Sequence, residues 1–397
     1  MNKLRISGKR LLDSLDRLST FGGRPDRGVD RLAGSAADLQ SRRWMAEHLQ
    51  AQGLESWTDE VGNVFGHAPG VGDSRLLLGS HTDTVPAGGR LDGAYGVMAA
   101  MEVLTTLHEH GHHAARCLEI VSFWDEEGAR PESSGGMVGS TALCRSPRLA
   151  LIDSYIELHI EQGPRMEEAG QELCVVEGIV GVDRHLIRVV GEPNHAGTTP
   201  FPLRKDAGRA LVRTAAVTQE LLRSVHDTVV GNIGTLTLDP GAPNVVPGAA
   251  QMVLEIRAPH EESLTRCADV ILERARTIAQ EEGCTVEHRL LSHKPVVDFD
   301  DGMRALLEKV TLGTGRAAGR LYSYAGHDAG VMSAHVPTGM VFVPSARGVS
   351  HSPREYTPEH LLVQGAQVLL DTVIAHAEAR TVSGSPGGAG AAPSARV

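Results

Sequence analysis

The alternation of apolar and polar positions divides the N-terminal part of the chain into helical and extended segments. Amphipathic helices are predicted where apolar residues recur every three to four positions, and buried strands where short apolar runs end in polar residues. Strands that alternate with helices are typical of an α/β domain with a mainly parallel central sheet flanked by helices. The predicted helices cover 7–22, 37–53 and 95–110, and the predicted strands cover 75–85, 117–126 and 154–162.

The pattern changes over residues 183–293. A strand, a helix, two strands, a second helix and a last strand follow one another there, with the helices at 205–225 and 261–282. The order β-α-β-β-α-β predicts an inserted α+β domain that is ferredoxin-like.

The α/β pattern returns after residue 294, with a strand at 340–345 and a helix at 358–379. The residues after this helix are rich in Gly, Ser, Pro and Ala, a composition that predicts disorder. We therefore expect a larger domain in two segments, interrupted by a smaller one. The expected bounds are 1–182 and 294–380 for the larger domain, 183–293 for the inserted domain and 381–397 for a disordered tail.

Composition narrows the class of protein. A chain of 397 residues with 41% hydrophobic and 22% charged positions is typical of a globular protein with two domains. Its net charge of −11 argues against nucleic acid, because phosphate binding needs a basic face. No apolar run has the length of a membrane span, and the N-terminus lacks the apolar segment of a signal peptide. Five scattered cysteines without CxxC spacing favour reduced thiols, so we expect a cytoplasmic protein.

Residues that bind metals gather near the carboxyl end of a predicted strand. His81 and Asp83 lie in GSHTDTV, and Asp92 follows in GGRLDGAYG. An imidazole and a carboxylate there suit a divalent metal such as Zn²⁺. Asp83 faces the same side as His81 in an extended chain, where its side chain can fix the imidazole tautomer. By itself such a pair is as often structural as functional.

Further candidate metal-binding and catalytic residues lie near the ends of the strands that follow. Glu126 and Glu127 end CLEIVSFWDEE and point to opposite sides, so one can bind metal while the other faces a water molecule. His159 lies in ELHIEQG and His351 in the loop GVSHSPREYT. Each alone favours an ordinary structural role. Taken together, the three imidazoles and two carboxylates give two metals three ligands each if Asp92 bridges them, with an open position for water.

The sequence of these motifs resembles the binuclear zinc peptidase/amidase superfamily of aminoacylase and carboxypeptidase G. Within it, the chain is most similar to the branch of N-carbamoyl-L-amino-acid hydrolases, β-ureidopropionase and allantoate amidohydrolase. ELHIEQGP, with His159 where the peptidases carry an acidic residue, separates this branch from them. The resemblance spans Arg31 to Tyr356 and rests on GSHTDTVPAGGRLDGAYGV, DEEG, ELHIEQGP, GEPNHAGTTPFPLRKDA, PGAPNVVPG, LEIRAP, AGHDAG and FVPSARGVSHSPREYT.

The resemblance implies a hydrolase that cleaves the carbamoyl (ureido) C–N bond of an N-carbamoyl amino acid and releases the amino acid, CO₂ and ammonia. It implies two divalent metal ions, zinc before manganese, cobalt or nickel. Glu126 is then the general base and acid. The implied ligands are His81, Asp92 and His159 for one metal, and Asp92, Glu127 and His351 for the other.

The resemblance also implies that residues 183–293 form a lid and dimerisation domain, and hence that the protein is a homodimer. His195 is implied to have a catalytic role as well, at the partner subunit's site. The substrate is a small carboxylate, and an arginine fork matches its geometry. The implied substrate-binding residues are Gln162, His195, Asn244, Arg257 and His327.

Three alternatives remain open: allantoate amidohydrolase, an N-acyl amino acid hydrolase or dipeptidase, and a non-catalytic binding relative. Residues 131–140 depart from the pattern of the branch, which leaves the shape of the substrate pocket open. The histidine-rich segment 108–116 is predicted to be a helix end, with cations near the negative end of the dipole, rather than a metal site.

Overall fold

The computed structural model describes residues 4–133 and 135–383, and the chain divides into two compact units. The expected inserted domain lies within the second unit. The expected tail lies outside the described residues from 384 onward, and helix α10 continues to Ser383. Unit 1 comprises Met1–Glu177, Phe299–Leu321 and His327–Val397, and unit 2 comprises Gly178–Asp298 and Tyr322–Gly326.

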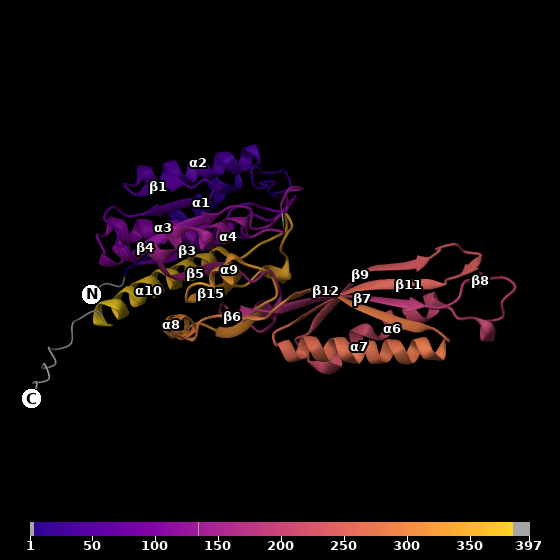
Figure 1. Cartoon of the computed structure of the whole chain (residues 1–397). Helices are drawn as coiled ribbons and strands as arrows, with labels where there is room; N and C mark the ends of the chain where they lie inside the picture. The colour runs from indigo at the N-terminus through magenta and orange to yellow at the C-terminus, as the bar shows by residue number, and fades with distance from the viewer. Residues whose placement is uncertain (1–3, 134, 384–397) are drawn as a thin grey trace, which may run out of the picture. The chain divides into compact units, whose positions relative to one another are not determined.

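The larger sheet has nine strands, and its four central strands, all in unit 1, run parallel in the order β4-β3-β5-β15 (Figure 1). These strands are almost wholly buried, as expected for apolar strands covered on both faces. The predicted mainly parallel central sheet is therefore confirmed, and antiparallel pairs extend it at both sides. The strands are β1 (Glu55–Thr58), β2 (Val64–His67), β3 (Arg75–His81), β4 (Leu118–Phe123), β5 (Ile152–Ile160), β6 (Leu173–Ile179), β13 (Val297–Asp298), β14 (Ala318–Ser323) and β15 (Thr338–Val343).

Helices flank this sheet, as predicted. Ser7 and Ser35 cap the first two helices, since each hydroxyl accepts a hydrogen bond from a backbone N–H in the first turn. Leucine, valine and methionine side chains from α1, α2, α3, α8 and α10 form one continuous core. Among the described residues, no helix combines the length and apolar character that a membrane crossing requires. The helices of unit 1 are α1 (Gly8–Ser19), α2 (Ala36–Ala51), α3 (Ala94–Glu109), α4 (Val138–Arg145), α5 (Arg165–Glu168), α8 (Asp301–Leu312), α9 (Asp328–Met332) and α10 (Glu359–Ser383).

Helix α3 packs unusually close to strand β5. A Cβ added at Gly96, near the start of this helix, would lie 2.2 Å from the carbonyl oxygen of Leu158. Tyr95 fixes the same turn by donating a hydrogen bond from its hydroxyl to the carbonyl oxygen of Leu362, at 2.8 Å. The close approach brings Asp92, two residues before α3, toward His159 on β5.

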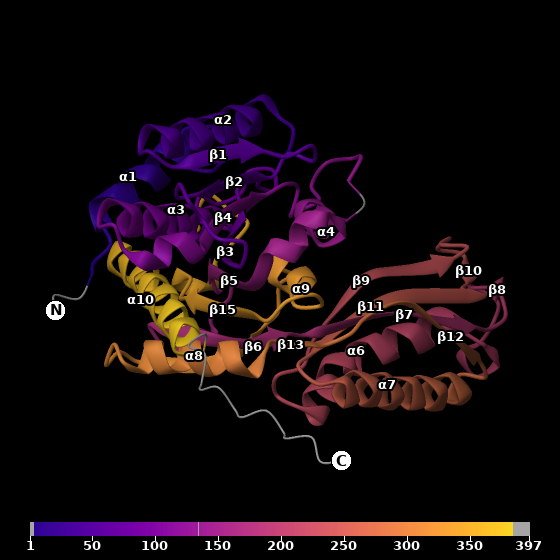
Figure 2. The same cartoon turned by 60° about the vertical axis from the view of Figure 1, so that its left-hand side comes forward.

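Unit 2 has the predicted β-α-β-β-α-β order. Its antiparallel sheet runs β12-β7-β11-β9, and α6 and α7 cover one face of it (Figure 2). Alternate residues of β7 and β11 face the helices and form a separate core. A short ribbon of β8 and β10 pairs apart from this sheet. The elements are β7 (Gly181–Val190), β8 (Asn194–His195), α6 (Ala207–Val225), β9 (Val230–Asp239), β10 (Val245–Val246), β11 (Ala249–Ala258), α7 (Glu261–Glu281) and β12 (Thr285–Lys294).

Replacing Gly96 with alanine tests the close approach of α3 to β5. The added methyl group meets a backbone oxygen that has no rotamer to move, so we expect the free energy of unfolding to fall by about 1–3 kcal/mol. Gly72→Ala is the control, because its Cβ would only approach the carbonyl oxygen of Arg116 at 3.6 Å. Urea unfolding followed by circular dichroism measures both variants, and equal stability of the Gly96 variant and the wild type would contradict the packing described.

Candidate metal centre

Asp92 is a buried residue at the centre of a group of imidazoles and carboxylates near the carboxyl ends of the central strands, in which only His351 is exposed. Its Oδ1 lies 3.2 Å from Nε2 of His159 and 3.7 Å from Nε2 of His81. Its Oδ2 lies 3.1 Å from Nε2 of His351, and the same nitrogen lies 3.6 Å from Oε1 of Glu127. The two oxygens of one carboxylate therefore face two different sets of ligands.

The structure brings together all five predicted metal ligands. They form two groups that share Asp92, and within each group the potential ligand atoms lie within 4.8 Å of one another. These groups have the same composition as the two sets that the motifs imply. The histidine-rich segment 108–116 belongs to no such group among the described residues; it forms the end of α3 and the short helix that follows. The two groups are His81, Asp92 and His159, and Asp92, Glu127 and His351.

The orientation of two imidazoles fits a divalent metal. Nδ1 of His81 lies 3.0 Å from the carbonyl oxygen of Asp83, and Nδ1 of His159 lies 2.8 Å from that of Ile160. Because only an N–H can donate to a carbonyl, these contacts place a proton on Nδ1 of each ring, so Nε2 is the nitrogen that is available to a metal. In both rings Nε2 points toward Asp92, which is the orientation required of a metal ligand.

Two further groups of potential ligands are His81, Glu126 and Glu127, and Glu157, His159 and His327, and the second of these is less suited to a metal. Glu157 accepts hydrogen bonds from the hydroxyl of Ser80 at 2.6 Å and from the backbone N–H of Ala329 at 2.9 Å. Each of its oxygens therefore already accepts one hydrogen bond from the surrounding fold. Glu157 instead joins β3, β5 and α9 beneath the centre.

Asp83 connects the loops that follow β3 and β4. Its carboxylate was expected to hold the imidazole of His81, but Oδ1 lies 3.7 Å from that ring and the backbone carbonyl makes the contact. The carboxylate accepts instead from the backbone N–H groups of Glu126, at 3.3 Å, and Glu127, at 3.2 Å. Asp83 thus fixes the segment that carries both glutamates.

Glu126 has the environment of a general base. Its Oε2 lies 3.5 Å from Nε2 of His81, and burial raises its pKa well above the ordinary value. Burial, together with the charge of Asp92, raises the pKa of Glu127 to about 7. Buried carboxylates are costly unless cations compensate them, so this cluster favours bound cations. A carboxyl group with a raised pKa beside a metal site can also take up and release a proton near neutral pH.

Gln162 and His327, two of the predicted substrate-binding residues, lie against the centre. The side-chain amide of Gln162 donates to Oδ2 of Asp92 at 2.7 Å, and its nitrogen lies 3.4 Å from Nε2 of His351. The ring centroid of His327 lies 4.6 Å from that of His159 in an edge-on arrangement. Burial, helped by the nearby His159, lowers the pKa of His327 well below its ordinary value, so the ring is neutral.

Backbone strain concentrates around the same centre. Asp125, Gln162 and His351 have φ angles of 52°, 62° and 51°, in the left-handed region that non-glycine residues rarely adopt. Such strain persists only where the surrounding structure enforces it, and it is common at functional sites. Here it turns the glutamate-bearing loop, Gln162 and His351 toward Asp92.

Glu355 is a residue of this centre that sequence reasoning missed. Its Oε1 accepts from the backbone N–H groups of Leu91, at 2.8 Å, and Asp92, at 3.1 Å. Its Oε2 accepts from the hydroxyl of Ser350 at 2.8 Å, next to His351. The residue lies in the motif GVSHSPREYT, but nothing in the spacing of that loop shows that the side chain points inward.

The remaining predicted residues belong to unit 2, where they lie in two separate regions. His195 on β8 pairs with Val245, and the backbone N–H of Ala196 donates to the carbonyl oxygen of Asn244 at 3.0 Å, so His195 and Asn244 are neighbours. Arg257 lies near the end of β11. Its guanidinium contacts Oε1 of Glu255 at 2.8 Å.

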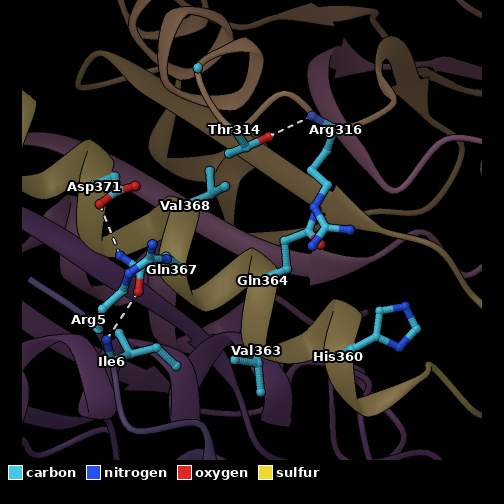
Figure 3. A pocket seen from close by; sticks show the side chains of 11 residues that line it. Arg5, Ile6, Thr314, Arg316, His360, Val363, Gln364, Gln367, Val368 and Asp371 are labelled. Carbon is cyan, nitrogen blue, oxygen red and sulfur yellow. Dashed lines mark hydrogen bonds between the residues drawn. The ribbon is translucent and has the colours of Figure 1, made fainter. Parts of the chain in front are cut away.

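A cavity of about 470 Å³ lies in unit 1 against the outer side of α10 (Figure 3). Gln364 and Gln367 on α10 line it together with Arg5 and Arg316. None of the predicted site residues lines it. The chemistry predicted from the sequence is therefore centred on Asp92 and not on this hollow.

A parallel sheet with paired imidazole and carboxylate ligands at its carboxyl edge defines an α/β metallohydrolase. The chain belongs to peptidase family M20/M25/M40, whose sequence pattern matches residues 77–375. The resemblance inferred from the motifs is thereby confirmed.

Similar proteins cover nearly the whole chain. An N-carbamoyl-L-amino acid amidohydrolase of Geobacillus stearothermophilus is 34% identical over 93% of this chain and 98% of its own length. An allantoate amidohydrolase of Bacillus subtilis is also 34% identical, over 94% of this chain and 98% of its own. The crystal structure of a hydantoinase/carbamoylase family amidase from Burkholderia ambifaria is 31% identical and superposes with a TM-score of 0.86 over 94% of this chain and 98% of that one.

Replacing Glu355 with glutamine tests whether this residue holds Asp92 in place. The amide group cannot accept all three hydrogen bonds, so we expect the affinity for divalent metal to fall about 10–100-fold, the usual effect of losing a partner of a ligand. The exposed Glu359→Gln, four residues later, is the matched control. Equilibrium dialysis with Mn²⁺ or Co²⁺ measures the affinity, and an unchanged value for the Glu355 variant would remove it from this role.

Proposed function

We propose that this protein is a metal-dependent amidohydrolase that cleaves the carbamoyl C–N bond of an N-carbamoyl amino acid. The observation that carries the proposal is the carboxylate of Asp92, whose two oxygens face two sets of ligands with Glu126 close by. Relatives named for N-carbamoyl amino acids and for allantoate, both ureido compounds with a carboxylate, support the substrate class. The five cysteines, all free, support the predicted reducing cytoplasm.

The proposed cofactor is a pair of divalent metal ions, with zinc before manganese, cobalt or nickel. His81, Asp92 and His159 would hold one ion, and Asp92, Glu127 and His351 the other. The lone pairs on Nε2 and the shared carboxylate fit such a pair. Bound there, the metals would supply Lewis acidity and lower the pKa of water.

Glu126 would carry the protons of the reaction. As general base it takes a proton from the attacking water, and as general acid it delivers that proton to the leaving amine. Burial raises the pKa of the Glu126 carboxyl, which makes its carboxylate a stronger base and so favours the first step, the uptake of a proton from water. His195 would stabilise the oxyanion of the tetrahedral intermediate by a hydrogen bond.

Arg257 would bind the carboxylate of the substrate. Its guanidinium side chain is 34% exposed, so it is accessible to a ligand. Glu255 holds it in place with an Nε–Oε1 distance of 2.9 Å, and the backbone carbonyl of Tyr324 accepts a second hydrogen bond at 2.5 Å. An arginine fixed in this way offers its remaining donors in a plane that matches a carboxylate.

The positions within unit 2 support a site completed by a second subunit. Asn244 lies five residues before Ala249, where β11 begins, and Arg257 lies near the other end of that strand. The strand between them spans about 25–30 Å at the rise of an extended chain. One small substrate therefore cannot contact Arg257 and the His195–Asn244 pair of the same subunit, so we propose that the pair acts on the partner's site.

The edge strand β9 supports a homodimer. Nearly every residue of β9 is exposed, and it pairs with β11 on one side only. Leu236 and Leu238 on this strand are each 41% exposed, and Val212 on α6 is 52% exposed. An exposed edge with apolar side chains is a template for pairing with another chain, and a second copy offers the same edge.

Allantoate amidohydrolase is the second candidate, because allantoate also carries ureido groups and a carboxylate and a relative bears that name. An N-acyl amino acid hydrolase or dipeptidase is less favoured, since His159 occupies the position where those relatives carry an acidic ligand. A non-catalytic relative is disfavoured because Glu126 and all five ligands are present. The substrates distinguish these candidates directly.

Ammonia release by the purified, metal-loaded protein tests the function. We expect metal-dependent release from an N-carbamoyl-L-amino acid or N-carbamoyl-β-alanine, and Glu126→Gln should lower turnover by at least about 10²–10⁴-fold while keeping its metal. Release from allantoate alone would select the second candidate. Cleavage of only N-acetyl or dipeptide controls, measured as free amine, would contradict the proposal, as would full activity of the Glu126 variant.

A heterodimer tests whether His195 acts on the partner's site. One subunit carries Glu126→Gln and the other His195→Ala, and two different affinity tags isolate the mixed dimer. If His195 acts across the dimer, one of the two sites is intact and about half of the wild-type activity returns. If His195 acts within its own subunit, neither site is intact and the mixed dimer is as inactive as the two parent variants. Failure to recover any dimer would contradict the proposed assembly.

A further inference from the structure

Arg42 is a buried arginine beneath the loop that carries Glu126 and Glu127. It lies on α2, a helix that contributes none of the predicted site residues, and only 4% of its side chain is exposed. A fully buried guanidinium is costly unless hydrogen bonds satisfy its donors. The partners of Arg42 therefore show what the side chain is placed to hold.

Those partners are the last residues before the glutamate-bearing loop. Nη1 of Arg42 donates to the carbonyl oxygen of Ser122 at 3.2 Å, and Nη2 donates to that of Phe123 at 3.0 Å. The guanidinium also stacks over the ring of Trp124 with its carbon 4.8 Å from the ring centroid. The last two residues of β4 and the tryptophan that follows them are thus in contact with one side chain, directly before Asp125.

The guanidinium is itself held in a fixed orientation. Its Nε donates to Oδ1 of Asp38 at 2.9 Å, one turn earlier on α2, and Nη1 also donates to the carbonyl oxygen of Gly62 at 3.0 Å. Asp38 is fully buried, and its Oδ2 accepts from the backbone N–H of Gly34 at 2.9 Å. A planar fork with five donors makes all these contacts at once, whereas a lysine ammonium has no such geometry.

Asp83 holds the same loop at a second point. It accepts hydrogen bonds from the backbone N–H groups of Glu126 and Glu127. Arg42 therefore fixes the backbone carbonyls before the two glutamates, and Asp83 fixes the amides of the glutamates themselves. The strained φ of 52° at Asp125, between the two anchors, shows that the loop does not adopt this turn without restraint.

We propose that Arg42 is a positioning residue for the candidate metal centre, which sets the carboxylates of Glu126 and Glu127 through the backbone of residues 122–124. The inference rests on the proposed function, because Glu127 is there a metal ligand and Glu126 the base. A merely structural role would instead be to pack α2 against the sheet. The two roles differ in what they do to metal binding by the folded protein.

Arg42→Lys is the test, and the exposed neighbour Arg43→Lys is its matched control. We expect the Arg42 variant to fold. Its affinity for Co²⁺ or its kcat should fall about 10–100-fold, while its KM should change little. The visible absorption band of bound Co²⁺ should also change, because the Glu127 ligand is displaced. Asp38→Asn, which loosens the fork without removing it, should shift the same quantities in the same direction by a smaller factor.

A lower thermal midpoint with Co²⁺ affinity, spectrum and kcat equal to the wild type would overturn the proposal and assign Arg42 a packing role. If Arg42→Lys does not fold, Asp38→Asn decides by the same criterion. If the wild type binds metal but cleaves no ureido substrate, the proposed function is wrong. The role of Arg42 is then tested by comparing the Co²⁺ affinities of the variant and the wild type. A wild type that binds no divalent metal overturns both.

Discussion

The candidate centre depends on one buried carboxylate that contacts two imidazoles, one on strand β5 and one in the loop after β15. Asp92 is only 4% exposed, and its two oxygens contact His159 and His351 at 3.2 and 3.1 Å. A buried charge is tolerated only with compensating partners, so these contacts hold the strand and the loop together. The neighbouring glutamates add further buried carboxylates, and divalent cations are the counter-charge that imidazole and carboxylate ligands accept best.

This arrangement requires the backbone to come unusually close to the ligands. Gly93 follows Asp92 with a φ of 61°, and a Cβ there would lie 2.4 Å from the imidazole of His81. Gly96 allows α3 to approach Leu158, the residue before His159. The two glycines of LDGAYG are therefore part of the geometry of the centre, since larger residues would push Asp92 away from both histidines.

The sequence predicts the helices and strands that have a periodic pattern of apolar residues, and the metal ligands that have a characteristic residue type. Parallel strands end at one edge of a sheet, so side chains such as His81, Glu127 and His159 were expected to meet there, and the structure brings them together. Contacts to backbone carbonyls and amides carry no such signature, because every residue offers the same acceptor and donor. For that reason Glu355 was missed, and nothing in the pattern of the predicted helix 37–53 indicated that Arg42 is buried.

The buried arginines show how the fold supplies cations near the centre without competing for its ligands. Arg31, which is fully buried, donates to the carbonyl oxygens of Thr82 at 2.7 Å and Leu18 at 2.9 Å. Arg42 likewise donates to carbonyls at the end of β4. An ion pair from either arginine to Glu126 or Glu127 would neutralise a group that a metal or a proton must reach. Because both guanidiniums bind backbone oxygens instead, they fix the strand ends and leave the carboxylates of the centre to bind cations.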